Sequence, residues 1–184
     1  MMKIDGSSNI FRYHSLYWTN AATYNDNSYG RDGGLDNRQF KESTYGRTSF
    51  NEICVGMKYS GQFRAFSFSF PASSLYSLIA DGKYRETRFG RLKWKSLIYG
   101  SSLQRYCNRE GFNVYVPSHN VKVRLGLVAN EFNECDHPDS FIGLGGYDTQ
   151  CFYSHAPNAA GNLAQCSPDN GNKNARAMAY ILVR

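Results

Sequence analysis

The chain has 184 residues, a length that suits one domain with a buried core. Its 14 tyrosines, 12 phenylalanines and 17 glycines, against only 5 prolines, argue against a long helical bundle and favour a loop-rich fold with β-structure. The net charge of +6 suits an acidic partner. No nucleic-acid-binding motif accompanies this charge, so we do not expect nucleic acid to be that partner.

The N-terminal part, residues 1–49, is polar and aromatic with few aliphatic side chains. We predict short strands and loops that are held by rings. The first residues lack the apolar stretch of a signal peptide or a membrane span. We therefore interpret the chain as the mature part of a longer secreted precursor, with a cytosolic protein as the alternative.

Residues 49–70 read as a β-hairpin with Ser60 and Gly61 at the turn. In the second strand Phe66, Phe68 and Phe70 alternate with serines. This period of two predicts that the three rings share one buried face. An exposed aromatic strip that binds a ligand is the alternative.

Two short helices are predicted next. The first begins at Ser73 or Ser74 and ends near Gly82. The second covers 87–99, with Leu92, Trp94, Leu97 and Ile98 turned inward. Lysines and arginines concentrated in 83–109 then form an exposed basic helix face, which either contacts acidic polymers or complements acidic parts of the same chain.

The C-terminal half is expected to supply strands at 113–116, from 121 onward and at 177–183, the last apolar enough to be central in a sheet. The 5 cysteines contain no CxxC pair, which favours disulfides in an oxidising compartment over a zinc site. A bridge between Cys151 and Cys166 would close a polar loop. Since the count is odd, one thiol is free or pairs outside the chain.

The segment 123–148 changes from an apolar strand to an acidic loop and then to a glycine turn. The loop holds Asn130, Glu131, Asn133, Glu134, Asp136 and Asp139. Calcium takes six to eight such hard oxygen ligands in flexible geometry. The EF-hand spacing is absent, and an ordinary solvated acidic loop is the alternative interpretation.

Catalysis is not expected. The 4 histidines are spread along the chain, and none belongs to a recognisable nucleophile signature.

Residues 129–184 resemble the C-terminal part of intelectins, the X-type lectins, which are related to the fibrinogen C-terminal domain. The matching pieces are Asn130-Glu131, FIGLGGY at 141–147, Gln150-Cys151 and AMAYILVR at 177–184. The chain as a whole, including YWTN at 17–20 and FNEICVGM at 50–57, is also similar to secreted cnidarian proteins, some of them described as skeletal organic matrix proteins.

The resemblance implies an α+β fold. The expectation is one loop-rich, fibrinogen-C-terminal-like domain over 1–184, with a twisted, mainly antiparallel sheet and two short helices. Residues 1–49 would form its irregular aromatic part and 50–184 its core.

The function implied by the resemblance is secreted, calcium-dependent binding of a glycan diol. The implied calcium ligands are Asn130, Glu131, Asp136 and Asp139, with Asp148 closing the set, and Tyr153 and His155 would contact the sugar. Where the family has Glu-His, this chain has Pro138-Asp139, which alters the ligand that faces the sugar.

The alternative function is a structural matrix or adhesion module. In it calcium only stiffens the loop, and the basic helix 83–109 contacts acidic matrix polymers. A homo-oligomer is compatible with either function.

Overall fold

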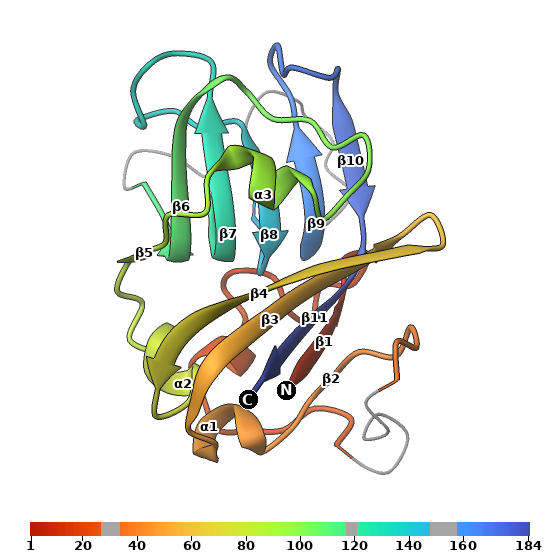
Figure 1. The fold of residues 1–184 in the computed structure, drawn as a ribbon, viewed down its shortest axis with the longest axis vertical. Helices are drawn as coiled ribbons and strands as arrows, with labels where there is room; N and C mark the ends of the chain where they lie inside the picture. Colours follow the sequence, from red (N-terminus) through yellow and green to blue (C-terminus); the bar gives the residue numbers. More distant parts are fainter. Residues whose placement is uncertain (27–33, 117–120, 148–157) are drawn as a thin grey trace.

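The computed structural model describes residues 1–26, 34–116, 121–147 and 158–184. In these ranges the chain forms two antiparallel sheets, one of five strands and one of six (Figure 1). The five-stranded sheet has the order β2 (Phe40–Lys41), β1 (Met2–Asp5), β11 (Met178–Val183), β3 (Phe50–Tyr59) and β4 (Gln62–Ala72). The six-stranded sheet has the order β10 (Lys173–Arg176), β9 (Ala160–Ala164), β8 (Ser140–Leu144), β7 (Val123–Asn130), β6 (Tyr106–Val114) and β5 (Arg85–Glu86).

Helices are short and peripheral. They are the 3-10 helix η1 (Leu16–Trp18) and the α-helices α1 (Thr44–Arg47), α2 (Leu75–Ile79) and α3 (Arg91–Lys95). The α+β prediction, with its fibrinogen-C-terminal-like single sheet, is therefore wrong: the fold is β-rich, with two sheets. The physical reason is that alternating and continuous apolar runs fill both sheets, whereas no helix is long enough to form a layer of its own.

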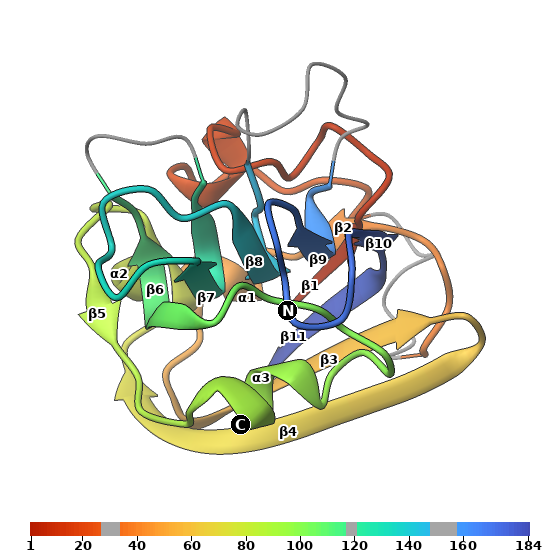
Figure 2. The ribbon, with the colours of Figure 1, turned by 90° about the horizontal axis from the view of Figure 1, so that it is seen from above.

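The predicted hairpin is confirmed as β3 and β4, with register pairs from Tyr59 and Gln62 onward. Phe66 and Phe68 are buried and Phe70 is half-buried. Between ring centroids, Phe66 lies 5.3 Å from Trp94 on α3, Phe68 4.5 Å from Phe89 in the segment before α3, and Phe70 5.0 Å from Phe112 on β6 of the other sheet. In Figure 2 the long curved β4 wraps around the side that carries α3. The phenylalanine face of β4 therefore belongs to the core between the sheets.

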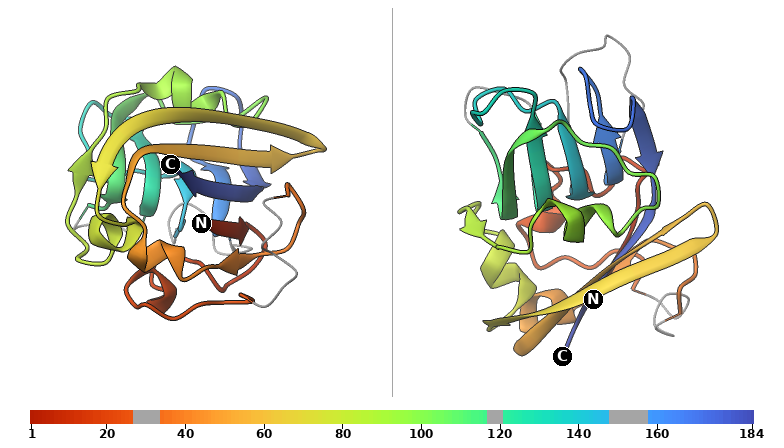
Figure 3. Two further views of the ribbon diagram at one scale, coloured as in Figure 1. Left: turned by 60° about the horizontal axis from the view of Figure 1, so that its bottom comes forward. Right: turned by 45° about the horizontal axis from the view of Figure 1, so that its top comes forward.

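The last strand is central, as its composition predicts. β11 pairs with β1 on one side and β3 on the other. The two chain ends consequently lie close together in the five-stranded sheet (Figure 3). Most apolar residues of this strand are buried.

The first predicted helix is confirmed and the second is shorter than expected. Ser74 and Ser77 form a reciprocal capping box at the start of α2. α3 occupies only five residues of the predicted 87–99. Gly90, with φ of 81°, directly precedes its first residue, and residues 96–99 continue as turns and a bend. Leu92, predicted to face inward, is 82% exposed, whereas Trp94, Leu97 and Ile98 are buried.

A buried carboxylate holds the segment that leads into α3 against the six-stranded sheet. Glu110, on β6, is 7% exposed. It accepts hydrogen bonds from Thr87 Oγ1 (2.8 Å) and Trp94 Nε1 (2.8 Å). The main-chain N–H groups of Phe89 (3.1 Å) and Gly90 (2.7 Å) donate to the same carboxylate. Four donors on one buried charge fix where α3 lies.

Replacing Glu110 with alanine leaves these four donors without their acceptor. We expect Glu110→Ala to lower the free energy of unfolding by about 3 kcal/mol or more, because each buried unsatisfied donor costs about 1–3 kcal/mol. Urea denaturation measures the loss. Glu86→Ala, at an exposed ion pair with Arg88, is the control and should change stability by less than about 0.5 kcal/mol. Equal losses in the two variants would contradict this account.

Candidate functional site

The acidic loop connects β7 to β8 at one end of the six-stranded sheet, where Figure 1 shows it as the teal loop at the top. Of the predicted site residues, Asn130, Glu131, Asp136 and Asp139 can be placed. Asp148, Tyr153 and His155 lie outside the described residues. Within the described ranges no group of three or more His, Cys, Asp or Glu side chains could hold a metal ion.

Two of the predicted ligands do come together, around the buried side chain of Gln104. Gln104 Nε2 donates to Glu131 Oε2 at 2.6 Å, to Asp139 Oδ2 at 3.2 Å and to the Cys166 carbonyl oxygen at 2.9 Å. Its Oε1 accepts the N–H of Asp139 at 2.9 Å. We call Glu131, Asp139, the Cys166 carbonyl and Gln104 the Gln104 cradle.

The other two predicted ligands have different surroundings. Asn130 is fully buried, and its Nδ2 donates to the main-chain oxygen of Glu134 (3.1 Å) and to Glu134 Oε1 (2.6 Å). Its Oδ1 accepts the N–H of Glu131 at 2.9 Å. Asp136 is exposed, and its N–H donates to Glu134 Oε2. Asn130 and Glu134 thus shape the loop, and neither Asn130 nor Asp136 hydrogen-bonds Gln104 in these contacts.

A network behind the cradle sets the position of Gln104. The Gln104 N–H donates to Ser140 Oγ at 2.9 Å. The guanidinium of Arg91, on α3, donates to the carbonyls of Leu103 (2.7 Å) and Gln104. It also donates to Asp169 Oδ2 at 2.7 Å. The segment that carries Gln104 is therefore clamped to α3.

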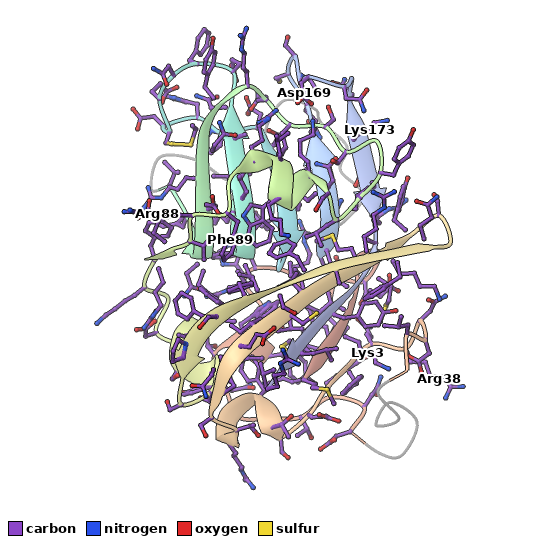
Figure 4. The ribbon with its side chains drawn as sticks, viewed as in Figure 1. Lys3, Arg38, Arg88, Phe89, Asp169 and Lys173 are labelled. Carbon is purple, nitrogen blue, oxygen red and sulfur yellow. A yellow bond between two sulfur atoms is a disulfide. The ribbon has the colours of Figure 1, made fainter. Side chains whose placement is uncertain are left out.

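Asp169, labelled in Figure 4, lies between β9 and β10 and gathers three donors. Lys95 Nζ lies 2.6 Å from its Oδ2, and the Leu103 N–H donates to Oδ1 at 3.0 Å. Burial by itself would raise the pKa of this carboxyl, but the hydrogen bonds from Lys95, Arg91 and the Leu103 N–H lower it to about 2.

A disulfide fixes the loop from the opposite side. Cys107 on β6 is bonded to Cys135 in the acidic loop, with 4.9 Å between the Cα atoms. Disulfide bonding, expected from the scattered cysteines, is thus confirmed. Cys54 is free and Cys166 is disulfide-bonded; Cys151, its predicted partner, lies outside the described residues.

Half of the cations in the basic segment 83–109 pair with carboxylates of the same chain. Arg85 pairs with Asp81 at 2.9 Å, and Arg91 and Lys95 both pair with Asp169. Arg88, labelled in Figure 4, is 3.0 Å from Glu86. These carboxylates belong to the same chain but lie outside the acidic loop. In these pairs the basic segment is therefore complemented by nearby carboxylates and not by the acidic loop.

Sequence reasoning missed Gln104, the Cys166 carbonyl, Arg91 and Asp169. A glutamine 27 residues before Glu131 carries no motif, and a main-chain carbonyl carries no residue-type signal. A buried polar stretch, Ser101 to Gln104, became recognisable only through its burial.

Comparisons with known proteins add no relative: no family model, no curated protein and no solved structure matches the chain. Helices in the part of the chain that the structure describes are all too short or too polar to cross a membrane.

The Asp169 network predicts an acid-sensitive stability. The pKa of the Asp169 carboxyl is about 2 in the folded protein and 3.8 ordinarily. Its contribution to stability is therefore complete at a pH above 3.8 and is lost as the pH falls towards about 2. Asp169→Asn should therefore lose less stability than wild type between about pH 5 and about pH 2, measured by urea unfolding at each pH. Glu86→Gln is the control and should follow the wild-type slope; the same slope in Asp169→Asn would refute the assignment.

Proposed function

We propose that this protein is a secreted, calcium-dependent carbohydrate-binding protein without catalytic activity. In this proposal Glu131, Asp139 and the Cys166 carbonyl hold the ion, and a glycan diol completes its ligands. Calcium supplies, when bound, coordination positions for two sugar hydroxyls. The resemblance to intelectins supports this proposal, and the Gln104 cradle is the observation on which it mainly rests.

The cradle gathers three oxygens around a single amide group. They lie between 2.6 and 3.2 Å from one nitrogen, Gln104 Nε2. An amide nitrogen has only two hydrogens, so Gln104 by itself does not serve all three oxygens. Two carboxylates and a carbonyl are the hard ligands that calcium prefers. The donor set therefore fits calcium and leaves positions for water and sugar.

Gln104 has a defined role in this proposal. Its neutral amide lies where the oxygens converge, so the ion and the amide compete for them. Glu131 is half-buried while Gln104 is fully buried, which puts the accessible side of the cradle at Glu131. We infer that the side-chain amide of Gln104 moves away from the three oxygens when the ion binds.

One observation favours the alternative, a structural adhesion module. The hydrogen bonds of Gln104, together with the disulfide from Cys107 to Cys135, already join the loop to the sheet without an ion. If this is their whole role, calcium at most stiffens the loop, no sugar binds, and removal of Gln104 only destabilises the loop.

Calorimetric titration with calcium tests the ion site, and a glycan array separates the two functions. We expect wild type to bind, and Glu131→Gln and Asp139→Asn to bind about tenfold more weakly or worse, since each removes one of two carboxylates. Asp136→Asn, which makes the same charge change in the same loop, should bind within about twofold of wild type. On a glycan array, a diol-specific signal should disappear with chelator.

Gln104→Ala tests the proposed competition between the amide and the ion. Because the Gln104 amide competes with the ion, its removal should keep or tighten calcium binding. The calcium-free variant should be less stable than wild type, since it loses the hydrogen bonds of Gln104. A titration without heat in both wild type and Gln104→Ala would overturn the calcium proposal and leave the adhesion module.

A further inference from the structure

A second cluster of polar side chains lies at the other end of β7. β7 runs from Val123 to Asn130, so Arg124 and the acidic loop are separated by about 20 Å of strand. Around Arg124 the loop after β1, the end of β6 and the residues after β8 bring together four basic side chains and three tyrosines. We call this the tyrosine–cation cluster: Arg12, Tyr13, His14, Tyr115, Lys122, Arg124 and Tyr147.

The cations lie on the tyrosine rings. Lys122 Nζ is 5.7, 4.8 and 5.7 Å from the ring centroids of Tyr13, Tyr115 and Tyr147. The Arg12 guanidinium lies 5.0 Å above Tyr147 and that of Arg124 4.2 Å above Tyr13. Main-chain hydrogen bonds of 3.0 Å in both directions join Lys122 to Tyr147, so the parts are held in place by backbone.

His14 completes the cluster at the surface. It is exposed, and its ring meets Tyr147 edge-on at 4.9 Å and Tyr13 at 5.3 Å. Burial, followed by the charges of Lys122, Arg124 and Arg12, lowers the pKa of His14. Burial and then Arg124 lower that of Lys122. Like charges are thus close enough to oppose one another.

No carboxylate relieves this repulsion in the described part of the chain. Arg124 donates to the Tyr13 carbonyl (2.8 Å) and to Asn113 Oδ1 (2.9 Å), which are neutral acceptors. Neither Arg12 nor Lys122 forms an ion pair with a described residue, in contrast to the pairs of 83–109. Moreover, Arg12 Nε is buried and has no hydrogen-bond partner among described atoms. The unsatisfied Nε costs free energy, and so does the closeness of the cations; an anion at the accessible ends of Arg12 and Lys122 would offset the repulsion between them.

The accessible donors suit a compact oxyanion. Arg12 and Lys122 are half-buried and His14 is exposed, whereas Arg124 is buried and already bonded. Three separate donors match the three terminal oxygens of a sulfate ester better than the two free oxygens of a carboxylate or a phosphodiester. Tyr13 is buried, and Lys122 or Arg12 lies over the rings of Tyr115 and Tyr147, an arrangement that favours an anion over stacked nucleic-acid bases.

We propose that the tyrosine–cation cluster binds the sulfate ester of an acidic glycan through Arg12, Lys122 and His14. This site uses none of the residues of the Gln104 cradle and needs no calcium. A failure of either proposal therefore leaves the other intact.

Size-defined dextran sulfate oligosaccharides, titrated into the full chain in the presence of chelator, test the proposal. Arg12→Gln and Lys122→Gln should each weaken binding about tenfold or more. Arg88→Gln removes the same charge from an exposed pair and is the matched control, with an expected change of less than about twofold. Circular dichroism establishes that the variants fold. In wild type, the NMR resonance of the His14 ring should shift when the oligosaccharide binds.

Other probes identify the anion. Unsulfated dextran, polygalacturonate and a single-stranded oligonucleotide should bind at least about tenfold more weakly than dextran sulfate. Equal weakening by all three substitutions would mean attraction by net charge alone and would overturn the site. Equal binding of polygalacturonate or the oligonucleotide would overturn its preference for sulfate, and an unshifted His14 resonance would overturn its location.

Discussion

The buried carboxylate of Glu110 is the interaction on which the architecture of the cradle depends. A buried charge is tolerated only when hydrogen bonds replace its water, and Glu110 receives four. By holding Gly90 and Trp94 it fixes α3 over β7 and β8. Arg91 then projects from α3 towards the carbonyls of Leu103 and Gln104, and Asp169 locks Arg91 from the far side. The orientation of Gln104 thus follows from a charge two strands away.

Some cations of 83–109 are paired, whereas polar groups of one kind gather at each end of β7. Arg85, Arg88 and Lys95 each have a carboxylate close by. At the Gln104 cradle three oxygens converge on one amide nitrogen, and at the tyrosine–cation cluster Arg12 and Lys122 form no ion pair with a described residue. Unbalanced polar groups cost stability, and proteins keep such groups mainly where a ligand completes them. The two ends are therefore complementary in chemistry, one suited to a cation and the other to an anion.

Local pattern predicted several elements well. The Phe66, Phe68 and Phe70 alternation, the Ser60-Gly61 turn, the Ser74 cap and the central β11 all follow from period, turn chemistry or capping within a few residues. The fold class was predicted wrongly, because the resemblance covered about the last third of the chain and carried an architecture that the strands do not adopt. The second helix was overextended, since the apolar residues Leu97 and Ile98 are buried beyond Lys95, where the helix ends.

By itself, the sequence determined that the chain is β-rich in its hairpin and last strand, aromatic in its packing and acidic in the 131–139 loop. It also singled out Glu131 and Asp139, and the structure brings these two together. Tertiary structure alone decided that they meet at Gln104, that Asn130 turns to Glu134 and that Arg91 and Lys95 pair with Asp169. It also decided that Arg12 and Lys122 gather around Tyr13 and Tyr147 without an ion pair to a described residue. The reason is that hydrogen bonds between residues far apart in the chain depend on how strands are ordered and how α3 is clamped, and neither is encoded in local spacing.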